Sequence, residues 1–299
     1  SVASYNIACF AVFPTMKVAV TGCGLVAQVM HIPYLVELSD VELHALVDPA
    51  EARAETLAAR YDVSHVYAEH ETLLEERRDG LDAVVVLTPS HAHADVVVDA
   101  LDTGVDVLVE KPIAATLADA DRMVEAERAS EATAMVAYMK RYDPAYERAA
   151  EAIDGLDSID LVTAYDVDPD HERIVNEIYD LVGGQPPEDL LEESVAKRQQ
   201  DIERAIGTDD DLLVDAYDFQ LEHVCHDVNV LRGLFGEVEA IDYVNVFANG
   251  RYATAQLTYE GGVQCVLETG DSDRKWFEEF VRVDGPDGMV EVDFSNPFI

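Results

Sequence analysis

The sequence is short of positive charge. Its 299 residues include 61 acidic but only 20 basic side chains, which gives a formal net charge of −41, and just five of the basic residues are lysines. Such a surface repels nucleic acids and anionic membranes, so we expect neither as a partner. Repulsion among so many carboxylates is screened only by salt. We therefore expect a halophilic protein that works in a salt-rich cytoplasm.

Cysteine and long apolar runs are scarce as well. The four cysteines contain no Cys-x-x-Cys pair, which argues against a disulfide framework and structural zinc. No stretch reaches the roughly 20 apolar residues of a membrane span. Residues 1–15 lack the basic start of a signal peptide. We therefore expect a cytoplasmic protein in which residues 1–15 are an N-terminal extension and Met16 is the natural start.

What is present is enough apolar sequence for two domains, since 49% of the residues are hydrophobic. Residues 16–142 alternate short apolar runs with amphipathic helical stretches, the pattern of a doubly wound parallel sheet. The expected strands are 17–21, 42–47, 65–67, 83–87, 106–109 and 133–138. The expected helices are 25–38, 50–60, 71–78, 91–103 and 117–130.

Residues 143–299 read as a second, α+β domain. A strand is expected at 159–165, then acidic, mostly helical sequence over 168–215, interrupted at 183–187, then a helix over 217–234. Afterwards the apolar period changes to two, which predicts an antiparallel meander. Its strands are 241–247, 252–259, 263–268, 279–283 and 289–294. The chain stops at Ile299 without a closing element, so we expect a missing C-terminal piece.

A glycine-rich loop follows the first expected strand. Gly22-Cys23-Gly24-Leu25-Val26-Ala27 opens the first helix, where backbone amides and the helix dipole suit a pyrophosphate. Asp48 ends the second strand, 24 residues after Gly24. A carboxylate there fits the ribose hydroxyls of NAD and would repel the 2′-phosphate of NADP. This predicts a dinucleotide site that favours NAD, with NADP as the alternative.

A lysine stands at the end of another buried strand. Glu110-Lys111-Pro112 follows an apolar run, and the carboxyl ends of parallel strands are where open α/β sheets bind ligands. The proline restricts the backbone of Lys111 and so directs its side chain. Lys111 is therefore a candidate catalytic acid or base.

Histidines supply the second candidate group. Glu222 and His226 lie four apart on one predicted helix and share a face. A histidine of ordinary pKa suits proton abstraction during hydride transfer, and the carboxylate could orient its ring. His223 is a rival, and His91 and His93 form another cluster. We considered a metal site built from His223, His226 and Glu222 and do not expect one.

Together these residues resemble the glucose–fructose oxidoreductase/inositol dehydrogenase (Gfo/Idh/MocA) family, and with the acidic composition they suggest a haloarchaeal member. The resemblance covers residues 16–299, strongly in the first domain. In the second domain it makes His226, not His223, the catalytic histidine, while Glu222 and Asn229 replace the usual acids. The motifs are Gly22 to Ala27, His31, Pro33, Asp48-Pro49, Thr88-Pro89-Ser90, His93, Glu110-Lys111-Pro112, Arg141-Tyr142-Asp143-Pro144, Glu222, His226, Asn229, Arg232 and Gly236.

The resemblance implies a Rossmann domain followed by an α+β domain with an open, mostly antiparallel sheet. It implies an NAD(P)-dependent oxidoreductase acting on a hydroxyl or keto group of a sugar or polyol, as a homodimer or homotetramer. Two alternatives are an NAD-retaining glycoside hydrolase of the same fold and a non-catalytic nucleotide-binding regulator. A cis peptide bond is expected at Lys111-Pro112.

The resemblance also assigns roles to residues. Lys111 would bind the reacting oxygen, His226 would accept its proton, and Glu222 would orient substrate or ring. Substrate contacts are expected from Lys111, Arg141, Glu222 and His226, together with Tyr165 and Asp166 at the end of a strand. Cofactor contacts are expected from Gly22, Gly24, Leu25, Val26, Ala27, Asp48, Thr88, Pro89, His93, Glu110 and Lys111.

Overall fold

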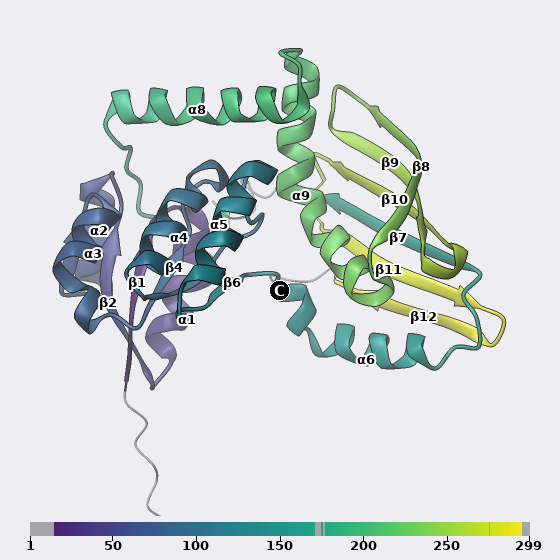
Figure 1. The fold of residues 1–299 in the computed structure, drawn as a ribbon, viewed down its shortest axis with the longest axis horizontal. Coiled ribbons are helices and arrows are strands. Elements are labelled where there is room, and N and C mark those ends of the chain that lie inside the picture. Colours follow the sequence, from purple (N-terminus) through teal and green to yellow (C-terminus); the bar gives the residue numbers. More distant parts are fainter. Residues whose placement is uncertain (1–14, 171–174, 176, 275, 295–299) are drawn as a thin grey trace, which may run out of the picture.

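The computed structural model describes residues 15–170, 175, 177–274 and 276–294. These residues form two six-stranded sheets, each with its own helices. Figure 1 shows the two sheets side by side, with helix α8 running across from the first unit toward the second. The expected fold class, a Rossmann-type parallel sheet followed by an α+β domain, is confirmed.

The first sheet is wholly parallel, with strand order β3-β2-β1-β4-β5-β6. The order reverses between β1 and β4, and ligands bind at the carboxyl ends of the strands beside such a reversal. The strands are β1 (Met16–Thr21), β2 (Val41–Val47), β3 (His65–Tyr67), β4 (Ala83–Val86), β5 (Asp106–Val109) and β6 (Ala134–Val136). The helices are α1 (Ile32–Glu37), α2 (Glu51–Tyr61), α3 (His70–Arg77), α4 (His93–Asp102) and α5 (Leu117–Ala129).

Apolar residues cover both faces of this sheet, as a doubly wound sheet requires. Successive side chains of a strand point to opposite faces. Along β4, Val84 and Val86 therefore join the core cluster that includes α4, whereas Val85 joins the cluster on the other face with α2. This two-sided burial explains why the strands are continuous apolar runs in the sequence.

The first helix differs from its prediction. Residues 25–37 are helical, close to the predicted 25–38, but Ala27–His31 within this stretch is π-helical and precedes the short helix α1. Pro33 lies at the start of α1 and has no N–H to donate to the preceding turn. The missing donor accounts for the π-helical part, so the helix after the glycine loop is locally widened rather than regular.

The second sheet has the order β12-β11-β7-β10-β9-β8. The expected simple meander is wrong in one respect, because β7 lies between β10 and β11 and runs parallel to β10. A long segment separates β7 from the later strands, so local turn signals carry no information on its place. The strands are β7 (Leu161–Asp168), β8 (Val238–Phe247), β9 (Tyr252–Tyr259), β10 (Val263–Asp271), β11 (Glu278–Gly285) and β12 (Gly288–Asp293).

Helices α6 (Pro144–Asp154) and α9 (Asp211–Phe235) pack on the second sheet through a cluster that includes Tyr146 and Leu231. Helix α9 begins six residues earlier than predicted, because the Asp210 carboxylate accepts the N–H groups of Leu212 and Leu213 and caps it there. Helix α8 (Glu188–Ile206) precedes α9. In the part of the chain described, no helix is long and apolar enough to cross a membrane.

The segment before α8 docks on the first domain. The Gln28 side chain donates to the carbonyl of Val182 (3.1 Å) and accepts its N–H (2.7 Å). Arg53 donates to the carbonyl of Gly184 (3.0 Å). A Cβ on Gly184 would lie 2.8 Å from the Cβ of Arg53, so this close approach needs glycine. The segment 180–184, which we call the strap, thus contacts the π-helical turn after β1 and the first turn of α2.

Candidate active site

A cavity of about 670 Å³ lies between the two domains. The first domain contributes the tip of the glycine loop and the end of β5, and the second contributes β7, α9 and β11. Its walls include Leu25, Val26, Glu110, Lys111, Lys140, Asp166, Asp168, Glu222, His223, His226 and Glu279. The structure therefore brings Lys111 together with Glu222 and His226, which follow it by 111 and 115 positions in the sequence.

The glycine loop is built as the motif requires. Gly22 has φ +88°, and a Cβ there would lie 2.5 Å from the Leu87 carbonyl oxygen. Gly24 has no heavy atom within 4 Å of an added Cβ, so its backbone faces open space. Leu25 and Val26 are about 40% exposed although apolar, and both line the cavity. The loop thus offers an open backbone beside an apolar wall, which suits a dinucleotide.

Asp48 is not the free carboxylate that the prediction of a preference for NAD assumed. It is only 1% exposed, and its carboxylate accepts the N–H groups of Cys23 and Ala50, both at 2.7 Å. Arg53, which sequence reasoning missed, donates to both carboxylate oxygens at 2.8 and 2.9 Å. The negative charge that was expected to reject NADP is therefore paired with a cation, and this ground for preferring NAD is weakened.

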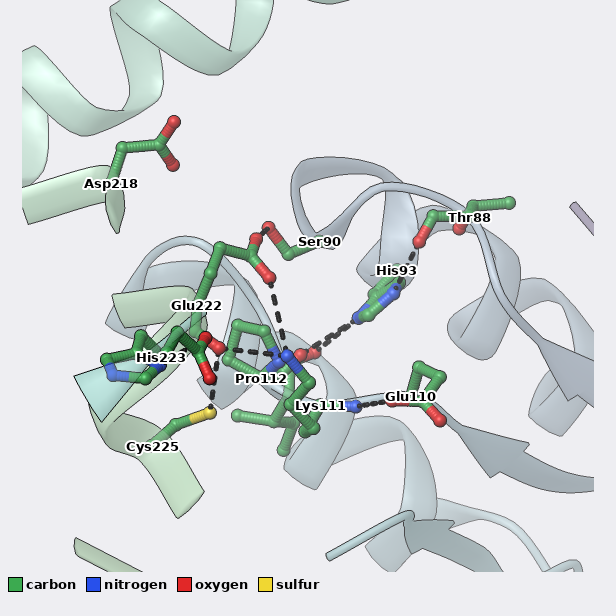
Figure 2. A network of polar contacts seen from close by, with 12 residues as sticks. Thr88, Ser90, His93, Glu110, Lys111, Pro112, Asp218, Glu222, His223 and Cys225 are labelled. Carbon is green, nitrogen blue, oxygen red and sulfur yellow. Dashed lines mark hydrogen bonds and ion pairs between the residues drawn. The ribbon is translucent and has the colours of Figure 1, made fainter. Parts of the chain in front are cut away.

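Lys111 sits at the centre of the site (Figure 2). The Lys111-Pro112 peptide bond is cis, as the resemblance implied. The Lys111 ammonium donates to the Glu222 backbone carbonyl (2.8 Å) and lies 4.0 Å from the Glu222 Oε2 atom. Glu110 is held by His31 Nε2 (2.8 Å) and by the Lys111 N–H (3.0 Å). A strand-end lysine of the first domain thus reaches helix α9 of the second.

His93 holds the loop that carries Lys111 in place. Its ring lies between the Thr88 carbonyl (2.8 Å) and the Pro112 carbonyl (3.0 Å), and the residue is 1% exposed. His93 was predicted to contact the cofactor, but it is not among the cavity-lining residues, and neither are Thr88 and Pro89. The ring instead joins the loop after β4 to the loop that carries Lys111, which fixes where the lysine stands.

Glu222 is held by donors from two other elements. Its Oε1 atom accepts the Ser90 hydroxyl (2.7 Å) and Arg198 Nη2 (3.0 Å), the latter from helix α8. The hydrogen bonds of the described residues include none between Glu222 and His226, so the expectation that Glu222 orients that ring is not supported. Ser90 was named only as part of the Thr88-Pro89-Ser90 motif, without a role, and Arg198 was not selected from the sequence.

The two histidines of α9 have opposite pKa shifts. Burial, together with Lys140 and Lys111, lowers the pKa of His226 to about 2, so the assumption of an ordinary pKa is wrong. Burial also opposes a charge on His223, but its hydrogen bond with Asp168 (2.9 Å) and the nearby carboxylates raise its pKa to about 9. His226 is therefore a neutral imidazole that can accept a proton, while His223 is an imidazolium held in an ion pair.

A buried acidic cluster of the second domain borders the cavity; Asp166 and Glu279 line it, and Asp227 lies behind them. Asp166, Asp227 and Glu279 are each 1% exposed. Burial raises the pKa of Asp166 to about 6 and that of Glu279 to about 7, and it raises the pKa of Asp227 well above its ordinary value. Burial disfavours the ammonium of Lys140, but these carboxylates outweigh that effect and raise its pKa, and Lys140 donates to Glu279. The wall offers a bound ligand both hydrogen-bond donors and acceptors.

Among the described residues, three clusters of histidine and carboxylate side chains bring their ligand atoms close enough to hold a metal ion. None of these clusters contains His226 or Glu222. Asp166 and Asp168 do approach His223, but the ring is already engaged in its ion pair with Asp168. The metal site that the sequence raised, built from His223, His226 and Glu222, is therefore not assembled.

Two predicted substrate residues lie elsewhere. Arg141 donates to the Asn229 carbonyl (3.1 Å) and stacks on the Tyr146 ring, where Gly233 leaves room for it. Tyr165 stacks on Phe280 with ring centroids 5.5 Å apart. Neither is among the residues that line the cavity. Because β7 alternates its faces, Asp166 reaches the cavity and its neighbour Tyr165 does not.

Comparison with known proteins agrees with this architecture. Residues 16–138 match the family model described as an oxidoreductase family with an NAD-binding Rossmann fold. The chain is 28% identical over 139 residues to scyllo-inositol 2-dehydrogenase (NAD(+)) of Bacillus subtilis, which covers 46% of this chain and 40% of that protein. It is 36% identical over 118 residues to D-xylose 1-dehydrogenase (NADP(+)) 2 of Haloferax volcanii, covering 40% and 36%.

Solved structures extend the likeness to both domains at the level of the fold. Myo-inositol 2-dehydrogenase from Lactobacillus plantarum has a TM-score of 0.73 at 19% identity, covering 94% of this chain and 76% of that one. Scyllo-inositol dehydrogenase from Lactobacillus casei, with NAD(H) and scyllo-inositol, has a TM-score of 0.71 at 18% identity, covering 93% and 76%.

The sequence alignments span about two fifths of the length of these curated relatives. Residues 16–138 contain the glycine loop, the six parallel strands and the lysine at the end of β5. Residues 16–138 therefore resemble the NAD-binding Rossmann domain of the Gfo/Idh/MocA oxidoreductases.

Proposed function

We propose that the chain is an NAD(P)-dependent dehydrogenase that transfers a hydride between nicotinamide and a hydroxyl or keto group of a sugar or polyol. The observation that carries the proposal is a single cavity lined by the glycine loop, by Lys111 and by His226. A nucleotide regulator needs no such pair of proton-handling side chains beside the cofactor wall. Inositol and xylose dehydrogenases among the relatives support the same substrate class.

The residues fit the cofactor that the family implies. The open backbone at Gly24 lets a pyrophosphate approach, and Leu25 and Val26 give an apolar surface for a flat ring. When bound, the nicotinamide accepts or supplies the hydride, which is chemistry that no side chain provides. Because Asp48 is paired with Arg53, we propose that NAD and NADP both bind.

Lys111 and His226 would divide the handling of the reacting oxygen. The Lys111 ammonium carries three protons and uses one on the Glu222 carbonyl, so it can donate another to a substrate oxygen. The neutral His226 imidazole accepts the hydroxyl proton during oxidation. Glu222 Oε2, which faces Lys111, accepts a second hydroxyl.

A symmetric assembly fits the surface of the second sheet. Strand β8 exposes several large apolar side chains, and exposed apolar patches mark interaction sites. They are Ile241, Tyr243, Val244, Val246 and Phe247. We therefore propose a cytoplasmic homodimer or homotetramer that pairs through this face, which light scattering after gel filtration would test.

The test of function is a panel of inositols, aldoses and their derivatives with NAD or NADP in molar KCl, following absorbance of the reduced cofactor. We expect turnover in the wild type and a loss of at least about 100-fold in kcat for Lys111→Met and His226→Asn. Lys17→Met is the matched control, since Lys17 lies at the opposite end of β1. Full turnover in both site variants would refute these roles, and no turnover in the wild type would refute the dehydrogenase assignment.

A further inference from the structure

Helix α8 carries an arginine into the site from outside both sheets. We propose that Arg198 is a positioning residue that fixes the carboxylate of Glu222 toward Lys111, which makes α8 part of the active site. This inference rests on the proposed dehydrogenase function. It adds a requirement, since an intact α8 becomes necessary for full turnover.

The Arg198 guanidinium donates hydrogen bonds to two carboxylates of helix α9. Its Nε and Nη2 atoms donate to both carboxylate oxygens of Asp218 at 2.5–3.0 Å, and Nη2 also donates to Glu222 Oε1 at 3.0 Å. Asp218 and Glu222 are four apart on α9, and like charges at that spacing repel. The guanidinium lies across both carboxylates and neutralises the repulsion. A planar fork does this with directional hydrogen bonds that an ammonium cannot reproduce.

The same contacts decide which way Glu222 points. Oε1 accepts two donors, from Ser90 at 2.7 Å and from Arg198 at 3.0 Å, while Oε2 is the atom 4.0 Å from the Lys111 ammonium. A free glutamate side chain samples several rotamers, and ordering it costs conformational entropy. The hydrogen bonds from Arg198 and Ser90 order the side chain before substrate binds. They hold Oε1 in place, and Oε2 remains facing the cavity.

Arg198 is itself held by the packing of α8 on the first domain. His91 Nε2 hydrogen-bonds with the Ser194 hydroxyl (2.8 Å), and the Lys197 ammonium donates to the His91 carbonyl (2.7 Å). Burial, with Arg198 and Lys197 nearby, lowers the pKa of His91 to about 4, so this ring is neutral at neutral pH. The arginine is thus anchored to one domain through its helix and to the other through its guanidinium.

The test compares Arg198→Met and Arg198→Lys with the matched control Arg204→Met. Arg204 is on the same helix, its side chain is 76% exposed, and among the described residues its ion pair is with Asp201, three positions earlier. We expect Arg198→Met to lower kcat by about 10- to 100-fold, since small displacements of a catalytic group have effects of this size. The affinity for NADH, titrated by fluorescence, should change less than about twofold. Arg198→Lys should recover part of the loss, because it restores charge without the fork.

A double-mutant cycle with Glu222→Gln separates positioning from structure. If Arg198 acts through Glu222, Arg198→Met should lower kcat much less in the Glu222→Gln background than in the wild type. An equal loss in both backgrounds, or equal kinetics for Arg198→Met and Arg204→Met, would overturn the inference while leaving the proposed function intact. A wild type without turnover on any substrate would instead overturn the proposed function, and this inference with it.

Discussion

Substitution by alanine should affect a different property at each glycine of the phosphate loop: stability at Gly22 and cofactor affinity at Gly24. Gly22 has φ +88°, and an added Cβ would lie 2.5 Å from the Leu87 carbonyl oxygen and 2.9 Å from the Thr88 nitrogen. Both are backbone atoms, which cannot rotate away as a side chain would. The left-handed conformation costs about 1–2 kcal/mol and the overpacking about 1–3 kcal/mol more. Gly22→Ala should therefore lower the free energy of unfolding by roughly 2–5 kcal/mol.

Gly24 has neither the positive φ nor the close backbone neighbours of Gly22. An added Cβ has no heavy atom within 4 Å, so Gly24→Ala should fold with wild-type stability. Its methyl group would instead occupy the space where a pyrophosphate must approach the backbone. We expect the affinity of Gly24→Ala for NADH to fall about 10-fold or more, a loss of about 1.4 kcal/mol or greater.

Thermal unfolding and fluorescence titration of NADH, both in molar KCl, measure the two effects separately. Gly22→Ala should lose roughly 5–15 °C in Tm. A Gly22→Ala protein with the wild-type Tm would refute the strain argument. Wild-type NADH affinity in Gly24→Ala would show that the pyrophosphate does not lie on this loop, which would contradict the cofactor placement.

Three further outcomes are expected. First, the raised pKa of His223 gives stability that is complete below about pH 6.5 and lost as the pH rises toward about 9. Asp168→Asn should therefore lower the free energy of unfolding, measured with urea, by about 1–3 kcal/mol at pH 6 and by less above pH 9; a pH-independent loss would contradict this. Second, the net charge of −41 should make Tm rise steeply as KCl increases, whereas a Tm insensitive to salt would refute the halophilic interpretation. Third, Gln28→Ala should release the strap, which limited proteolysis would detect as new cleavage near residues 180–184, and unchanged protection would show that other contacts suffice.

Much of the first domain could be predicted from the sequence because its signals are local. The glycine loop, the apolar runs and the lysine before Pro112 each combine a pattern with a fixed place on a strand or helix. The spacing of Glu222 and His226 places both on one helix, and both do line the cavity. These features needed no knowledge of the rest of the fold.

The features that could not be predicted from the sequence depend on contacts between segments that are distant along the chain. The place of β7 beside β10 has no local turn signal, and Arg198 lies in an acidic helix whose sequence does not show which face meets α9. The pKa of His226 depends on burial and on two lysines from other elements. Arg53 was missed for the same reason, although its position one turn after Asp48 would have suggested a pairing.

The strap and helix α8 also determine how the two domains can move. The chain passes from one domain to the other near residue 143, and 40 residues later it returns to bind Gln28 and Arg53 before α8 is fastened to His91. Two bodies joined at a single point can rotate in any direction, whereas bodies joined at two separated points rotate only about the line between them. Once the contacts of Lys111 and Ser90 with Glu222 have separated, we therefore expect the cavity to open about one axis while the strap stays bound, and any wider movement to require its hydrogen bonds to break.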